Sequence, residues 1–125
     1  MEAGLNISMD KFTRFAEVVI ESTQDEKFQE FLETRKAGAA KIQSAAAAKG
    51  GPSTLTAQHF AAKAKPYAEA IECVNHRDRE TTYAKHADEC LHKLSKWKTM
   101  TQREFQTIMG ELEVWGEVYI KSKGH

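Results

Sequence analysis

The sequence contains few of the residues that break helices or build β-sheets. Among its 125 residues only two are proline and seven are glycine, and the strand-favouring residues valine and isoleucine are scarce. Alanine, glutamate, lysine and glutamine, which favour helices, are abundant. Hydrophobic residues make up 41% of the chain and charged residues 29%, which supplies enough apolar material for a folded core. These proportions predict one all-α domain that spans residues 1–125.

Long apolar runs and cysteine pairs are equally scarce, and this limits where we expect the protein to work. No stretch approaches the roughly 20 apolar residues of a membrane-spanning helix. Acidic residues interrupt the first thirty positions, where a signal peptide would need an apolar run. Two cysteines, Cys73 and Cys90, do not make a disulfide framework. We therefore expect a cytoplasmic protein with no membrane partner, in which both thiols are reduced and act as small buried hydrophobes.

The short motifs of common catalytic and nucleotide-binding sites are missing as well. The sequence has no G-x-S-x-G, no phosphate-binding G-x-x-x-x-G-K and no G-x-G-x-x-G. Glu111, Glu113 and Glu117 lie on the last predicted helix, but no pattern assigns them an environment that raises a carboxyl pKa. We expect a non-enzymatic protein without a cofactor. No motif is long enough to indicate a resemblance to a named family.

Apolar residues that recur every three or four positions predict a compact bundle of about five helices. The expected helices span residues 9–22, 24–49, 56–75, 79–98 and 102–121. Capping-box patterns place two helix starts at Thr23 and Thr101, and Gly50-Gly51-Pro52 ends the second helix. Pro66 is expected to kink the third helix, because the apolar stripe keeps its phase across the proline. A change of phase in the stripe predicts a turn at Asn75–Asp78.

Several large apolar residues are expected in the core of this bundle. In the second predicted helix the apolar stripe that begins at Phe28 continues to Ile42. Trp97, Trp115 and Tyr119 are also more consistent with core packing than with a binding platform.

The net charge is zero, yet one segment is strongly basic. Residues 1–34 hold three basic and eight acidic residues. Residues 35–65 hold no acidic residue and six basic ones, which are Arg35, Lys36, Lys41, Lys49, Lys63 and Lys65. The dipole of the second helix accounts for Arg35 and Lys36, but not for a run that continues into the next helix. Such a run is either a solvated face or an anion-binding face.

Three functional hypotheses follow from these patterns. The first is a small interaction module (a regulator, an inhibitor or an assembly subunit) that binds a protein partner through the basic, alanine-rich region 35–65. The second is a nucleic-acid-binding protein that uses the same segment, although a neutral chain has limited affinity for DNA. The third is a metal-binding bundle. Cys73 and His76 are three residues apart, His86 and Cys90 are four apart, and each pair on one helix face would offer ligands for zinc. A homodimer formed through the wide apolar face of the last helix also stays open.

Overall fold

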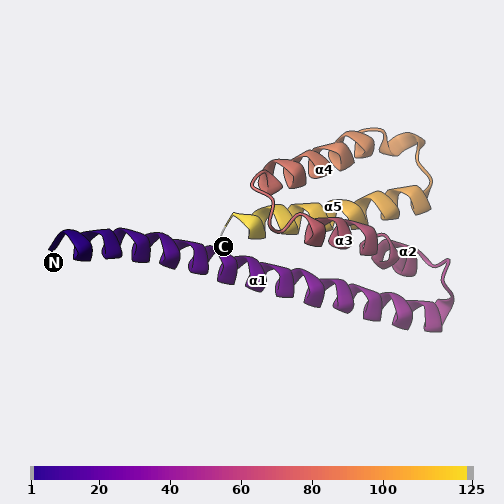
Figure 1. Ribbon diagram of the computed structural model, residues 1–125. Coiled ribbons are helices and arrows are strands. Elements are labelled where there is room, and N and C mark those ends of the chain that lie inside the picture. Colours follow the sequence, from indigo (N-terminus) through magenta and orange to yellow (C-terminus); the bar gives the residue numbers. More distant parts are fainter. Residues whose placement is uncertain (1, 124–125) are drawn as a thin grey trace.

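The computed structural model describes the backbone of residues 2–123 and the side chains of residues 24–123, and it is built from helices joined by short connections (Figure 1). In chain order the elements are α1 (Glu2–Gly50), α2 (Leu55–Ala61), α3 (Ala64–Glu72), α4 (Arg79–Leu94), the 3-10 turn η1 (Trp97–Thr99) and α5 (Gln102–Ser122). The described backbone contains no strand. The predicted all-α bundle is therefore confirmed. None of the described helices combines the length and apolar character that a bilayer crossing requires.

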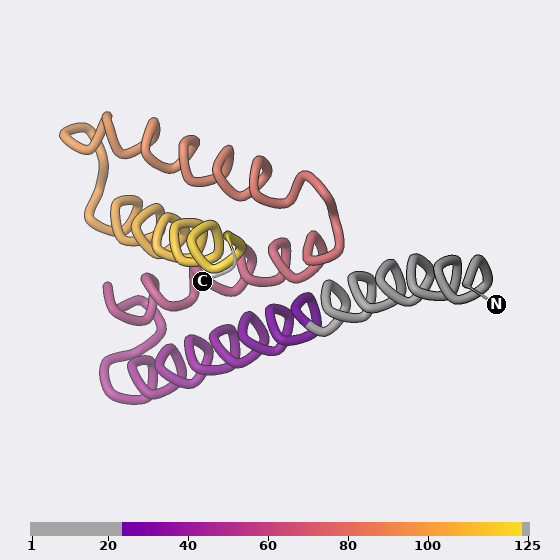
Figure 2. The backbone as a smooth tube through the Cα atoms, turned by 90° about the vertical axis from the view of Figure 1, so that its left-hand side faces the viewer, coloured from indigo at the N-terminus to yellow at the C-terminus, as the bar shows by residue number. Residues whose placement is uncertain are grey.

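Helix α5 lies at the centre of the bundle (Figures 1 and 2). It packs against α4 on one side and against α2 and α3 on the other, while α1 covers the outer side of α2 and α3. Across the bundle the order is therefore α1, then α2 and α3, then α5, then α4. This order matters for function because α1 and α4 each keep a face that no described helix covers.

An aromatic cluster holds the layers together at the core. Tyr83 on α4 is fully buried, stacks on Trp115 of α5 with ring centroids 6.0 Å apart, and meets Phe28 of α1 edge to face. Its hydroxyl donates a hydrogen bond of 2.8 Å to the carbonyl of Ala70 on α3. One side chain therefore contacts three other helices. Burying a large aromatic side chain contributes roughly 2–3 kcal/mol, and the hydrogen bond removes the cost of burying the hydroxyl.

The predicted helix start at Thr23 is wrong, because α1 continues through it as one helix from Glu2 to Gly50. A capping box favours a start, but it cannot stop a preceding helix when no glycine or proline is present. Asp25, expected near the start of a new helix, instead accepts a 2.7 Å hydrogen bond from Arg79 at the beginning of α4. The helix of the expected range 9–22 has no described side chains.

The predicted end of this helix is confirmed at the two glycines. The last residue of α1 is Gly50, and Gly51 adopts a φ of 95°, a conformation that favours glycine because it has no Cβ. The Gly51 amide donates to the carbonyl of Ala47. Helix α2 then begins under an N-cap, in which the Thr54 hydroxyl accepts a hydrogen bond from the Ala57 amide.

At Pro66 the structure has two helices rather than one kinked helix. Helix α2 ends at Ala61 and α3 begins at Ala64, with Pro66 in its first turn. Proline has no amide hydrogen, and its ring collides with the carbonyl four residues earlier, here that of Ala62. The backbone therefore leaves the helix at Ala62 and Lys63, although the buried Tyr67 keeps the phase of the stripe.

The remaining boundaries mostly agree with the prediction. The turn at Asn75–Asp78 is confirmed, and α4 begins at Arg79. Helix α4 stops at Leu94, earlier than the expected residue 98, and the chain turns through η1 before α5. The start of α5 is confirmed, since the Thr101 hydroxyl accepts a 3.1 Å hydrogen bond from the Glu104 amide.

Candidate interaction surfaces

Arg35, the first residue of the predicted basic site, is half exposed, but its charge is already paired within the fold. Its guanidinium makes a two-pronged ion pair with Glu117 of α5, with contacts of 3.0 Å and 2.7 Å. The Tyr67 hydroxyl donates a third hydrogen bond to the same carboxylate. Burial, followed by the bond to Glu117, raises the pKa of Tyr67 to about 12, and the hydrogen bond to Glu117 raises the pKa of Arg35. This group ties α1 and α3 to α5.

Lys63 is likewise used within the fold. Its ammonium lies 2.8 Å from the carboxylate of Glu113, and only 12% of its side chain is exposed. His59 lies 2.9 Å from the same carboxylate through Nε2 and 3.0 Å from the Gln106 amide oxygen through Nδ1. Burial works to raise the pKa of Glu113, but the hydrogen bonds from Lys63 and His59 outweigh it, and the pKa is lowered.

The other four members of the predicted basic site remain at the surface. The Lys65 side chain is 86% exposed, and its ammonium lies 3.9 Å from the carboxylate of Glu69, one turn further along α3. An ion pair this exposed to solvent contributes little to stability. The other three basic residues of the predicted site lie on α1, and within residues 24–123 no ion pair involves Lys36, Lys41 or Lys49. The structure therefore divides the predicted site into two residues that pair with α5 and four that remain accessible.

A groove runs between the end of α1 and the start of α2, and we call it the α1 groove. It has a volume of about 470 Å³ and is lined by Ile42, Ala45, Ala46, Lys49, Gly50, Thr54 and Thr56. Ile42 was expected in the core but is 46% exposed. Ala39, almost one turn earlier on α1, is 6% exposed and belongs to the core, so the buried stripe of α1 ends before Ile42.

The predicted metal ligands do not come together. Cys73 and His76 lie beyond the end of α3, where the helical spacing that would align them no longer applies. His86 stacks on Trp115 with centroids 4.2 Å apart, and Cys90 is buried. Burial raises the pKa of the Cys90 thiol, which disfavours the thiolate that zinc requires. Across the described side chains, no group of three or more histidine, cysteine or acidic residues is placed to hold a metal.

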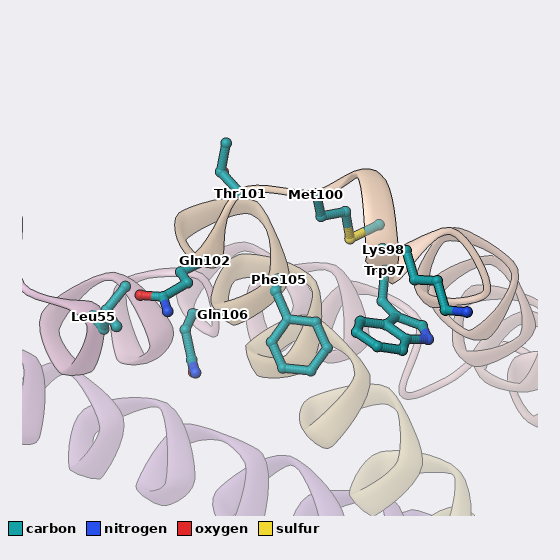
Figure 3. Close-up of a pocket in the computed structure, with 8 residues that line it drawn as sticks. All are labelled: Leu55, Trp97, Lys98, Met100, Thr101, Gln102, Phe105 and Gln106. Carbon is teal, nitrogen blue, oxygen red and sulfur yellow. The ribbon is translucent and has the colours of Figure 1, made fainter.

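A second groove lies where α4, η1 and α5 meet the start of α2, and we call it the Trp97 groove (Figure 3). It has a volume of about 540 Å³ and is lined by Leu55, Trp97, Lys98, Met100, Thr101, Gln102, Phe105 and Gln106. In Figure 3 the Phe105 ring lies between Leu55 on one side and Trp97 on the other. The expected core position of Trp97 is wrong, since 57% of the residue is exposed. Trp115 is buried as expected.

Sequence reasoning missed the Trp97 groove because it assumed that α4 continues to residue 98. A continuing helix would carry Trp97 on the same stripe as the buried Tyr83 and Cys90. The helix instead ends at Leu94, where the Ser95 hydroxyl donates to the carbonyl of His92. The signal that was available is the serine two residues before the tryptophan, because serine side chains compete for helical carbonyls.

No protein-family model, no curated protein and no solved structure matches this chain. The functional interpretation therefore depends on the chemistry of the two grooves and of the charged residues around them.

Proposed function

We propose that this chain is a small non-enzymatic interaction module that binds an acidic helical surface of another protein along the α1 groove. The observation that carries the proposal is the half-exposed Ile42, which follows Lys41 on α1 and lines the groove together with Lys49, two helical turns further along. An apolar side chain at the centre of a cationic surface is typical of a protein-binding site with a polar rim.

The geometry of the groove suits a helix. Ala45 and Ala46 line it with side chains of one carbon, so a partner backbone can approach α1 closely. Covering the exposed part of Ile42 would contribute about 1 kcal/mol of binding free energy. Lys41 and Lys49 are exposed and would add attraction for acidic residues and a faster association rate.

The internal ion pairs favour a protein partner over nucleic acid. Arg35 and Lys63 are neutralised by Glu117 and Glu113, so the segment presents fewer cations to phosphates than its sequence indicates. Binding to DNA or RNA without sequence specificity depends on the number of phosphates that the protein neutralises. A neutral chain in which Lys36, Lys41 and Lys49 have no ion pair among the described residues fits an acidic protein surface better. We place this module in the cytoplasm, where Cys73 and Cys90 would stay reduced.

The proposal is tested by reversing the accessible charges and leaving the internal ones intact. The double variant Lys41→Glu with Lys49→Glu changes the groove, whereas Lys85→Glu on the exposed side of α4 is the matched control. Arg35 and Lys63 are left unchanged because they hold α5 in place. In quantitative affinity capture, a partner that is recovered with the native chain and the control, but lost with the double variant, supports the proposal.

Three results would contradict the proposal. One is an unchanged set of captured proteins with the double variant. Another is a gel shift of DNA or RNA at low salt that the double variant abolishes, because that result assigns the surface to nucleic acid. The third is self-association of the native chain in analytical ultracentrifugation that the double variant removes, since the groove would then join two copies.

A further inference from the structure

The Trp97 groove is an exposed apolar surface separate from the α1 groove, and its lining residues are different. We propose that it binds a short acidic peptide segment of a partner protein, which inserts one large apolar side chain between Trp97 and Phe105. The proposal uses residues of η1 and α5 that the α1 groove does not share. Each proposal can therefore fail without the other.

The lining of the groove is suited to an apolar anchor. Trp97 is 57% exposed and Leu55 is 41% exposed, while Met100 and Phe105 are half-buried. Exposed tryptophan is uncommon on protein surfaces, and tryptophan is among the residues most often found at the centre of binding interfaces. A volume of about 540 Å³ lies in the range of cavities that enclose ligand groups, and methionine adapts to side chains of different shape.

The charges around the groove select an acidic ligand. From residue 90 to residue 103 the chain has no acidic residue, and its four basic residues are Lys93, Lys96, Lys98 and Arg103. All four are exposed, and no ion pair joins any of them to another described residue. Lys98 lines the groove itself, with its ammonium 5.8 Å from the centroid of the Trp97 ring. A carboxylate beside the anchor would therefore meet Lys98, whose ammonium has no ion-pair partner among the described residues.

The same features favour a peptide over single-stranded nucleic acid. Proteins that bind single strands stack successive bases on several aromatic faces. Trp97 is the one aromatic residue among the exposed large apolar residues of the described chain. The neighbouring lining residues Leu55 and Met100 offer aliphatic and thioether surface, which complements an apolar side chain better than a base.

The two tryptophans allow a direct binding test by NMR. Trp97 is exposed and Trp115 is 3% exposed, so their indole N–H signals report the groove and the core separately. The probe is a synthetic peptide with one phenylalanine flanked by glutamates. We expect the peptide to shift the Trp97 signal and to leave the Trp115 signal in place. A matched peptide with lysine in place of glutamate should not bind.

Affinity is then measured by fluorescence polarisation of the labelled acidic peptide. Trp97→Ala should weaken binding at least about tenfold, as truncation of a central tryptophan typically does. Lys98→Glu should weaken it several-fold and reduce its dependence on salt. The control is Leu91→Ala, because Leu91 is 54% exposed on α4 but does not line the groove. Circular dichroism confirms that each variant keeps its helices.

Several outcomes would overturn the proposal. One is a Trp97 signal that does not move at millimolar concentrations of the acidic peptide. An equal loss of affinity in Leu91→Ala would show that the groove is not the site. Displacement of the peptide by a single-stranded oligonucleotide of higher affinity would assign the groove to nucleic acid. A Trp97 signal that moves with protein concentration alone would assign it to a second copy of the chain.

Discussion

The close approach of α2 to α5 depends on the absence of a side chain at Gly110. A Cβ atom built on this buried glycine would lie 2.4 Å from the carbonyl oxygen of His59 and 3.3 Å from the Cβ of Ala62. Ordinary contacts at such positions begin at 3.4 Å, so Gly110→Ala requires the backbones of α2 and α5 to separate by about 1 Å. That movement would also stretch the contacts of His59 and Lys63 with α5.

The expected change in the free energy of unfolding of Gly110→Ala follows from two opposing effects. Alanine is favoured over glycine by about 1 kcal/mol in a helix interior, whereas overpacking a close contact costs about 1–3 kcal/mol. Gly116 lies on the same helix and has no atom within 4 Å of a built Cβ, so Gly116→Ala carries the helical gain alone. The free energies of unfolding of the two variants should therefore differ by about 1–3 kcal/mol, with Gly110→Ala the less stable.

Urea unfolding followed by circular dichroism measures this difference, and thermal unfolding gives an independent value. For a chain of this length each kcal/mol corresponds to roughly 4 °C in Tm. Because both variants replace a glycine by an alanine on the same helix, the gain in helix propensity cancels when their free energies of unfolding are compared. If Gly110→Ala proves as stable as Gly116→Ala, then α2 and α5 do not approach as closely as the structure indicates.

Three further predictions concern the charged groups between the layers. Arg35→Ala should lower the free energy of unfolding by about 1 kcal/mol, and a double-mutant cycle with Glu117→Gln should show coupling between the two side chains. Lys65→Ala should change the free energy of unfolding by less than about 0.5 kcal/mol. Glu113 has a lowered pKa in the folded state, so its contribution is present above about pH 4.5 and is lost on further acidification; stability should fall less steeply there in Glu113→Gln. Tyr67 has a raised pKa of about 12, so its contribution to stability is present below pH 10 and is lost as the pH rises towards 12. Tyr67→Phe should remove this part of the alkaline loss and leave the part due to Tyr83, whose pKa burial also raises.

Each of these expectations has a result that contradicts it. For Arg35 it is an absence of coupling in the double-mutant cycle. For Glu113 it is an acid limb of the stability curve that is identical in the native chain and the glutamine variant. For Tyr67 it is phenolate absorbance that shows all the tyrosines ionising together near pH 10, the ordinary value for this group.

Local patterns predicted the features that local energies control. The cap at Thr101 and the stop at Gly50-Gly51 follow from hydrogen bonds or dihedral preferences within a few residues. The turn at Asn75–Asp78 follows from the phase of the apolar stripes on either side of it. The start expected at Thr23 failed for a related reason: a capping box lowers the free energy of a new helix, but the existing helix loses backbone hydrogen bonds if it stops there. Only a helix-breaking residue or a tertiary contact decides whether a new helix starts there or the existing helix continues.

The sequence by itself determined that the protein is a helical bundle, because helix-forming residues and apolar periodicity act locally all along the chain. It also showed that residues 35–65 are basic, but only the tertiary structure decided which of those cations remain accessible. Arg35 meets Glu117 across 82 positions of sequence and Lys63 meets Glu113, and no local pattern encodes such a pairing. The exposure of Trp97 was decided in the same way, since it depends on where α4 stops and what α2 leaves uncovered.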